Sequence, residues 1–299
     1  MENKKHAYLL MLHHRKEIVD LLIAELDDAR NDLFVHIDPR SKDLDFENLH
    51  TNHAGLFRVD PIEVNWGGYS QIRCELLLMK KAKEQGPYAY YHLLQGSSFP
   101  LKSQDELHTF YDTHQGTEFI AIDRNLSFRE RVSHHYYFNE CIAMKTRKQR
   151  ILWNFSMKII RLQDKLNIDH FRKFQMSFKK GFALWSITDA FLDYVLKHER
   201  IIRKMMRFSH CGDEIFMQTL VYNSPFCCKL NFIDEEFSSS LWYSTWVYED
   251  VGLKRNQHNF LFCDLDDILN SGANFARKFE GEDGIALINA IKDKIHGKK

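Results

Sequence analysis

The stretch AYLLMLHHRKEIVDLLIAELDDARNDLFVHID, residues 7–38, decides the fold class. Residues 7–12 form a continuous apolar run, which predicts a buried strand, and residues 33–38 predict a second strand. Between them, residues 17–26 carry apolar side chains at the spacing of one helix face. A strand, a helix and a strand in this order predict a βαβ unit within a mostly parallel sheet.

The same alternation continues beyond this stretch. Residues 55–60 predict a third strand, a helical pattern follows the WGGY segment at 66–69, and residues 89–96 predict a fourth strand. Further along, residues 182–196 predict a strand that runs into a helix, and residues 211–225 predict a helix opened by two acids. We therefore predict an α/β fold with a mostly parallel mixed sheet flanked by helices, built as a single domain.

The composition excludes several classes of protein. The chain has 299 residues, 44% of them hydrophobic, and 41 basic residues balance 41 acidic ones. This balance argues against a general nucleic-acid-binding protein, so we expect no nucleic-acid partner. No apolar run approaches the about 20 residues that cross a bilayer. The six cysteines contain no CxxC pair, which predicts reduced thiols and a cytoplasmic protein.

The segment 145–180 departs from this charge balance. It contains eleven Lys or Arg residues and two acids, Asp164 and Asp169, which gives a local charge of +9, and apolar side chains are interleaved with the basic ones. Two interpretations of this segment stay open. It is either a solvated helical insertion with a basic face, or a patch for a membrane surface or an anionic ligand.

Two short acidic patterns resemble the DxD metal site of sugar-nucleotide enzymes. They are Asp43-Leu-Asp45 and Asp264-Leu-Asp266, in which paired carboxylates would hold a divalent metal. The pattern occurs by chance in many chains, and a helix N-terminus by itself explains an acid at position 264. We favour structural roles for both pairs and expect no metal site.

Three groups of side chains are candidates for a functional site. Asp213 and Glu214 open a predicted helix, where one acid explains the cap and the second is free to act as a general base. Arg277 and Lys278 lie in an apolar segment, so they need an anionic partner, which is either a ligand or a distant carboxylate. An aromatic stretch at 241–250 is suited equally to stacking on sugars and to core packing.

Taken together, seven segments in this order resemble the core-2/I-branching β-1,6-N-acetylglucosaminyltransferases and the related protein O-xylosyltransferases, with the features of a bacterial-type member. The segments span the chain from position 7 to position 280: AYLLMLHHR (7–15), FVHIDPRS (34–41), VNWGGYS (64–70), YYHLLQGSSFPLKS (90–103), GDEIFMQTLVYNSP (212–225), LWYSTW (241–246) and FARKFE (275–280).

The resemblance implies a glycosyltransferase-A-like fold and an inverting transfer from a UDP-sugar, with neither a metal nor another cofactor. It implies that Glu214 is the catalytic base. On the donor side it implies binding by Asp38, Trp66, Arg255, Arg277 and Lys278, with the last two and Arg255 at the diphosphate. On the acceptor side it implies binding by Trp246, Tyr248 and Arg131.

We accordingly expect residues 1–299 to form one catalytic domain. Within it we expect a nucleotide-binding βαβ half at 1–125, the basic helical insertion at 140–180, and an acceptor and diphosphate half at 181–299. Because the chain begins close to its first predicted strand and lacks paired cysteines, we expect a cytoplasmic enzyme of polysaccharide biosynthesis at the inner face of a membrane.

The donor sugar stays open at this point. We expect N-acetylglucosamine, transferred to a hydroxyl of a glycan or lipid-linked glycan, because the FALW segment at 182–185 lacks an acid that the xylosyltransferases have nearby. The WGG motif at 66–68 and the NSP motif at 223–225, however, are closer to the sequences of the xylosyltransferases. The alternatives are a xylosyltransferase that uses UDP-xylose, or a catalytically silent glycan-binding protein.

Overall fold

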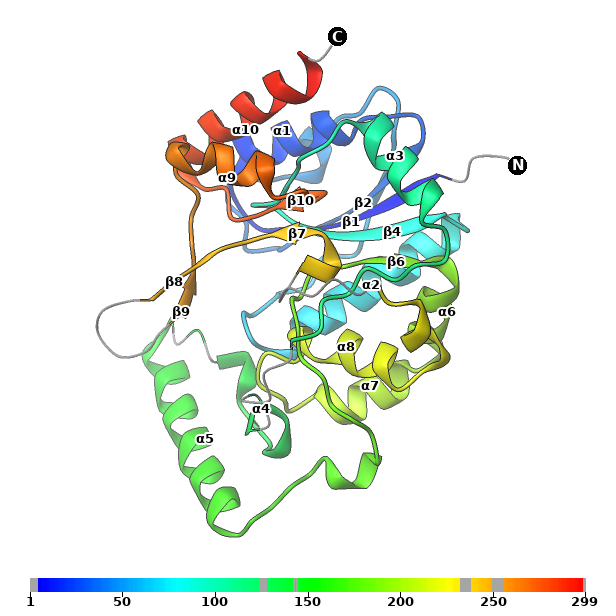
Figure 1. The fold of residues 1–299 in the computed structure, drawn as a ribbon. Coiled ribbons are helices and arrows are strands. Elements are labelled where there is room, and N and C mark those ends of the chain that lie inside the picture. Colours follow the sequence, from blue (N-terminus) through cyan, green and yellow to red (C-terminus); the bar gives the residue numbers. More distant parts are fainter. Residues whose placement is uncertain are drawn as a thin grey trace.

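The computed structural model describes residues 5–123, 128, 130–141, 143, 145–231, 238–248 and 255–297. These residues form a central sheet between two layers of helices, with a further helix standing away from both layers (Figure 1). The α/β class and the mostly parallel mixed sheet predicted from the sequence are confirmed.

The central sheet has five strands in the order β3-β2-β1-β4-β6. Strands β3, β2, β1 and β4 run parallel, and β6 pairs antiparallel with β4. All seven residues of β1 are buried because it lies between β2 and β4, which explains its uninterrupted apolar run. The strands are β1 (His6–Leu12), β2 (Asn31–Ile37), β3 (Gly55–Arg58), β4 (Tyr90–Gln95) and β6 (Ser186–Thr188).

Helices cover both faces of this sheet (Figure 1). One layer contains α1 (Lys16–Leu26), α3 (Gln104–Thr113), α9 (Leu265–Asn270) and α10 (Gly281–His296). The opposite layer contains α2 (Tyr69–Gln85), α6 (Asp189–Lys197), α7 (Glu199–Met206) and α8 (Phe216–Tyr222). The predicted helices at 17–26 and after WGGY are therefore present, and so is the predicted strand that runs into a helix at 182–196.

Short strands from distant parts of the chain pair beside the central sheet. β10 (Phe275–Ala276) pairs with β5 (Phe99–Pro100) on one side and with β7 (Trp242–Tyr243) on the other. A second pair joins β8 (Trp246–Tyr248) to β9 (Arg255–Gln257). This pairing brings the segment after β10 next to the chain that follows β4.

The predicted helix at 211–225 is broken in two, which corrects the sequence interpretation. A 3-10 turn, η4 (Gly212–Glu214), precedes α8 because Cys211 adopts a left-handed conformation with φ 50° and Ile215 leaves the helical region with φ −128°. The two acids therefore lie in a tight turn before the helix.

The basic segment contains a long surface helix, as predicted. Helix α5 (Arg147–Lys165) begins at Thr146, whose side chain accepts a hydrogen bond from the Gln149 amide in a capping box. It lies away from the central sheet at the lower left of Figure 1, close to α4 (Glu130–Ser133). Among the described residues, no helix combines the length and the apolar character needed to span a bilayer.

Helix α2 buries an acid against the sheet. Glu75 is 2% exposed and accepts a hydrogen bond from the Trp185 indole at 3.3 Å. Burial, together with the neighbouring Asp213 carboxyl, raises the pKa of Glu75 well above its usual value. The folded protein therefore holds a proton on Glu75 that the unfolded chain releases above about pH 4.3.

We predict that Glu75→Gln makes the protein more stable at pH 8 and leaves its stability nearly unchanged at pH 4. In the wild type, Glu75 lowers the free energy of unfolding as pH rises. This loss is absent below the pKa of Glu75 in the unfolded chain, and it grows by about 1.4 kcal/mol per pH unit until the pKa of Glu75 in the folded protein is reached. Urea unfolding at both pH values measures the difference, with Glu84→Gln on the exposed side of α2 as the control. An equal effect of Glu75→Gln at both pH values would show that Glu75 is ionised in the folded state.

Candidate active site

The carboxyl ends of β1, β2 and β4 meet at one edge of the sheet, where parallel α/β folds bind their ligands. His13 follows β1, Asp38 directly follows β2, and Ser97 lies in the turn after β4. Topology therefore collects polar side chains from three strands at this edge.

Asp38 is buried and saturated with hydrogen bonds. Its Oδ1 accepts from the amide and Nε of Arg40, and its Oδ2 accepts from Nη2 of Arg40 and the amide of Val64, at 2.7–2.9 Å. Burial opposes ionisation, but these donors outweigh it and lower the pKa of Asp38 to about 2. Asp38 thus fixes the turn after β2 against the segment before Trp66.

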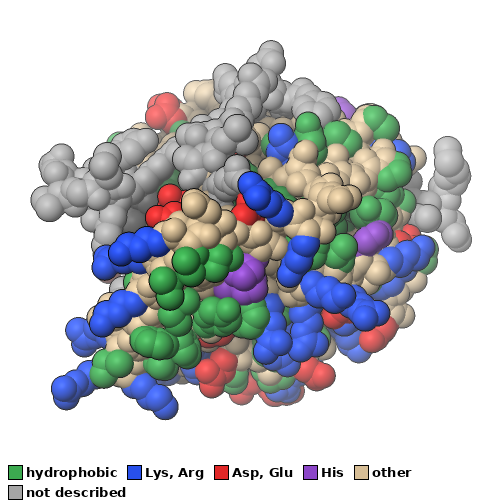
Figure 2. Space-filling model, turned by 90° about the horizontal axis from the view of Figure 1, so that it is seen from below, with side chains coloured by type: hydrophobic (Ala, Val, Ile, Leu, Met, Phe, Trp, Pro, Cys, Tyr) green, Lys and Arg blue, Asp and Glu red, His purple; other side chains and the backbone are tan. Residues whose placement is uncertain are grey.

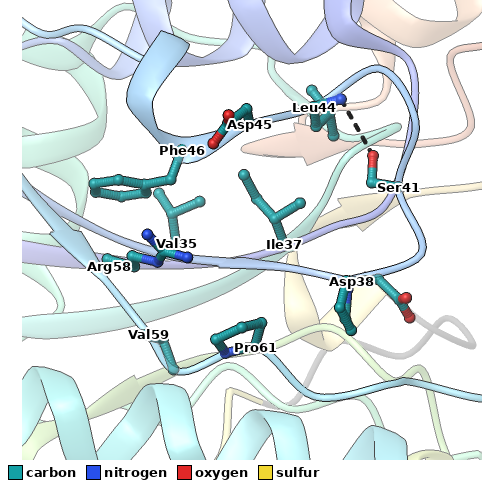
Figure 3. A pocket seen from close by; sticks show the side chains of 11 residues that line it. Val35, Ile37, Asp38, Ser41, Leu44, Asp45, Phe46, Arg58, Val59 and Pro61 are labelled. Carbon is teal, nitrogen blue, oxygen red and sulfur yellow. Dashed lines mark hydrogen bonds between the residues drawn. The ribbon is translucent and has the colours of Figure 1, made fainter.

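A cavity of about 180 Å³ lies beside Asp38 (Figure 3). Val35, Ile37 and Val59 line its apolar part, while Phe46 and Arg58 lie together at one end. The Asp38 carboxylate lies at the opposite end and points away from the apolar side chains. Neither Glu214 nor Arg277 lines this cavity.

The segment around Trp66 joins this end of the site to the acidic turn. Arg40 binds the Asn65 side chain at 2.9 Å, and the Gly67 carbonyl accepts a hydrogen bond from the Cys211 amide at 3.0 Å. Trp66 itself is 63% exposed, and its ring lies 6.5 Å from that of His210 in an edge-on arrangement. Its ring is therefore open to solvent between the Asp38 end and η4.

Glu214 is held by two cations. Its Oε2 accepts a hydrogen bond from Nη1 of Arg131 at 2.8 Å and lies 3.7 Å from Nζ of Lys180. Its Oε1 accepts no hydrogen bond from any residue that the structure describes. One oxygen thus orients the carboxylate, and the other is available to a ligand.

Asp213 is more deeply buried than Glu214. It is 7% exposed, and its Oδ2 accepts a hydrogen bond from Nε2 of Gln71 at 3.2 Å. Its buried Oδ1 has no hydrogen-bond partner among the described residues. Burial, with the charge of Glu214 beside it, raises the pKa of Asp213. The two acids therefore have different environments, and the more exposed one is Glu214.

Lys180 is a site residue that the sequence interpretation missed, because it counted this lysine only as the end of the basic insertion. The Asp123 amide donates to the Lys180 carbonyl at 2.7 Å, and the Gly181 amide donates to the Glu214 carbonyl at 2.9 Å. These bonds place the Lys180 ammonium 3.9 Å from the Asp123 carboxylate and 3.7 Å from that of Glu214. The adjacent Lys-Gly pair was the available signal, since Gly permits close backbone approach.

Arg277 and Lys278 have different environments. The Nε of Arg277 is buried and has no hydrogen-bond partner among the described residues. Burial lowers the pKa of Arg277 to about 10, although Glu280 and Asp213 raise it. Lys278 instead lies 2.7 Å from Oε1 of Glu280, whose Oε2 binds Arg15 at 2.7 Å. The predicted partner, a ligand or a distant carboxylate, is therefore wrong for Lys278, whose partner is the nearby Glu280.

Histidine and backbone groups complete this basic end. Desolvation lowers the pKa of His13 to about 4, and the charges of His14 and Arg277 act in the same direction while Asp38 opposes them. The Phe279 amide donates to the Ser97 carbonyl at 3.0 Å, which ties the basic segment to the turn after β4. The ends of β1 and β4 thus lie beside the Arg277 segment.

The remaining predicted residues lie on the β8–β9 hairpin. Trp246 is partly buried in β8, and Tyr248 pairs with Arg255 in the backbone register of the two strands. The side chains of Tyr248 and Arg255 lie outside the described part of the structure. Their predicted acceptor and diphosphate contacts therefore stay predictions.

Three of the four acids of the DxD patterns have hydrogen-bond partners, and the fourth lies at a helix start. Asp43 accepts hydrogen bonds from the amides of Arg15 and Lys16 at the start of α1, and Asp45 caps a 3-10 turn. Asp264 accepts from His258 and from the Leu261 amide, and Asp266 lies in the first turn of α9. Within the described ranges, no group of three His, Cys, Asp or Glu side chains is arranged to hold a metal ion.

These features define a class of protein: an α/β enzyme whose sheet edge carries an open carboxylate and a cluster of cations suited to an anionic ligand. Comparison with models of protein families agrees with this class and identifies the family. Residues 6–269 match the model of the core-2/I-branching enzymes, and the chain belongs to this family. It is therefore a glycosyltransferase, with a sugar donor and a glycan acceptor.

Comparison with solved structures finds similarity to the apo form of mouse xyloside xylosyltransferase 1. The two share 12% sequence identity with a TM-score of 0.30, over 72% of this chain and 81% of that chain. No curated protein sequence matches this chain.

We predict that Gly181→Ala destabilises the protein by about 1–3 kcal/mol and reduces its activity. A Cβ at this position would lie 1.8 Å from the Ala121 carbonyl oxygen, so the backbone that places Lys180 beside Glu214 must shift. Thermal unfolding compares it with Gly96→Ala, whose added Cβ meets its nearest neighbour at 3.5 Å. Equal unfolding temperatures for the two variants would contradict the packing argument.

Proposed function

We propose that this glycosyltransferase moves a sugar, N-acetylglucosamine, from a UDP-sugar to a hydroxyl of a glycan acceptor, with inversion at the anomeric carbon. The observation that carries the proposal is that two unlike groups lie on neighbouring segments, since the charge of Asp213, next to Glu214, acts on Arg277. Glu214 has an oxygen that is open to a ligand, and Arg277 has a buried guanidinium nitrogen without a partner among the described residues.

In the proposed reaction, the acceptor hydroxyl oxygen attacks the anomeric carbon from the face opposite UDP. Oε1 of Glu214 takes the hydroxyl proton as the new bond from carbon to oxygen forms. The bond from the anomeric carbon to the diphosphate oxygen breaks, and its electron pair stays on UDP. A positioned general base contributes typically about 10²–10⁴ to such a rate.

Arg277 and Lys278 supply positive charge at the leaving group in this proposal. Fixed cations stabilise the charge that develops on the diphosphate, as a divalent metal does in other enzymes. The proposal is therefore metal-independent, with no other cofactor. Because the Arg277 amide donates to the Tyr243 carbonyl at 3.0 Å, the backbone that carries this cation is fixed before the reaction begins. Arg255 is proposed to contribute a further positive charge there.

The other residues divide between the donor and the acceptor. We assign the cavity beside Asp38 to the uridine, with the exposed Trp66 ring on the donor side of the loop that leads to η4. Arg131 is proposed to contact the acceptor while it orients Glu214. Trp246 and Tyr248 are proposed to lie along the acceptor sugar.

We place this activity in polysaccharide biosynthesis, on the cytoplasmic side of a membrane. The acceptor is a glycan or a lipid-linked glycan, and the charge of the 145–180 segment supports an anionic membrane surface as a further partner.

We predict that Glu214→Gln lowers kcat by about 10²–10⁴ and leaves UDP affinity nearly unchanged, because the amide keeps the shape of the side chain but takes up no proton. Steady-state kinetics and calorimetric titration of UDP measure the two effects.

Glu84→Gln, which changes an exposed glutamate on α2, is the matched control and should retain wild-type kinetics. Wild-type turnover by Glu214→Gln would refute the mechanism even though the family assignment would stand.

We predict that one UDP-sugar raises the unfolding temperature in the presence of EDTA, since a ligand that binds only the folded state stabilises it. A thermal-shift and donor-hydrolysis screen with UDP-GlcNAc, UDP-Xyl, UDP-Glc, UDP-Gal and UDP-GalNAc identifies the donor. Arg277→Met should abolish the shift, and without ligand it should unfold at or above the wild-type temperature because a buried charge has been removed.

Lys294→Met, at an exposed position of α10, should keep the full ligand-induced shift. A shift that requires Mn²⁺ would contradict the metal-free proposal and return attention to the DxD acids. A shift with UDP-xylose alone would identify a xylosyltransferase, and no response to any nucleotide would favour a glycan-binding protein.

A further inference from the structure

Helix α5 exposes a continuous apolar stripe. Ile151, Phe155, Leu162 and the C-cap residue Leu166 are each 55–61% exposed. Their spacings of four, seven and four residues place them on one face of the helix. The opposite face is the one that packs on the protein, through Ser156, Ile160 and Gln163, which are buried.

Basic side chains border this stripe along one flank. The flank consists of exposed residues that follow the same helical repeat: Arg147, Arg150, Lys158, Arg161 and Lys165. Within the described part of the chain, no carboxylate lies within ion-pair distance of any of them. At the left of Figure 2, the side on which α5 lies in Figure 1, blue basic side chains stand beside green apolar ones.

We infer that α5 docks on an anionic lipid bilayer, with the apolar stripe in the interface and the basic flank at the headgroups. This inference deepens the proposed function, since it rests on the proposal of a membrane partner and names the face that contacts it. An apolar face that lies flat, next to Lys and Arg, is the arrangement of interfacial helices. The negative surface supplies the charge that the flank lacks within the protein.

A second copy of the chain fits this surface less well. Two copies related by a two-fold axis would bring the same stripe together and place the basic flanks of both copies at the rim of one contact. Five like charges on each side would then repel across the contact. A bilayer with negative headgroups buries the apolar stripe and neutralises the basic flank at the same time.

Ring contacts connect α5 to the catalytic groups. The Trp153 ring on α5 lies 6.0 Å from that of His210, whose ring in turn lies 6.5 Å from Trp66. The His210 amide donates to the Arg131 carbonyl at 2.9 Å, and Arg131 binds Glu214. A bilayer under α5 therefore lies close to the proposed acceptor side, where a lipid-linked acceptor would be presented to the base.

Co-sedimentation of the full chain with vesicles tests the docking. We expect binding to phosphatidylcholine vesicles that contain about 30 mol% phosphatidylglycerol, and little binding to phosphatidylcholine alone. The double variant Phe155→Ser with Leu162→Ser should lower the partition constant at least about tenfold. Lys158→Ala with Arg161→Ala should lower it about fivefold per residue, and raised salt should act in the same direction.

The matched control changes exposed apolar residues outside α5. Leu261 and Phe262 are 46% and 52% exposed and are followed by Asp264, Asp266 and Asp267. The variant Leu261→Ser with Phe262→Ser should therefore bind vesicles as wild type does. Circular dichroism and thermal unfolding check that each variant is folded.

Several outcomes would overturn the inference. The first is that the wild type does not bind anionic vesicles at low salt. The second is that the α5 variants and the control variant lose binding equally. The third is that the wild type forms a dimer and binds no vesicles, while the variant of the α5 stripe is a monomer. Donor hydrolysis measured without vesicles separates this result from the proposed function. The α5 variants should keep wild-type hydrolysis, so failed docking leaves the transfer proposal standing, and failed hydrolysis in wild type leaves docking standing.

Discussion

The site depends on the backbone contact between the Lys-Gly segment and the acidic turn. The Gly181 amide donates to the Glu214 carbonyl at 2.9 Å, and a Cβ at position 181 would lie 1.8 Å from the Ala121 carbonyl oxygen. Because main chain meets main chain here, Lys180 and Glu214 have little freedom to separate. The cation beside the carboxylate is therefore positioned by the fold more than by their own attraction, which is weak for partly exposed groups.

The sequence predicted the framework well, because its strongest patterns come from burial. Because strand β1 is fully buried, its sequence is a run of mostly apolar residues. Helix α1 is buried on one face, and its sequence has the corresponding helical periodicity. The break at Cys211 was not predictable, since its left-handed conformation is imposed on a residue that shows no local preference for it. The ion pair of Lys278 with Glu280 did have a local signal, because residues two apart in extended chain face the same side.

The site residues were predictable only where local chemistry or the family resemblance singled them out. Glu214 stood out as the second of two acids at a predicted helix start, although neither acid caps the helix in the structure. Lys180 did not, because its one local signal was the adjacent Gly181, and a lysine that ends a run of basic residues does not by itself indicate its tertiary neighbour. The apolar stripe of α5 was missed for a similar reason, because only the net charge of the basic segment was counted. The stripe becomes evident when Ile151 and Phe155 are placed on a helix by their spacing.

Arg277 explains why this arrangement suits the proposed transfer. Burying a guanidinium without a full set of partners costs stability, and Glu280 and Asp213 offset that cost only in part. Such a cost is tolerated where an anionic ligand supplies the missing contacts. In the proposed reaction the proton moves toward the open oxygen of Glu214, and the electron pair moves toward Arg277. Among the described residues, Glu214 and Arg277 are thus two incompletely satisfied groups that would receive the proton and the negative charge when transfer occurs.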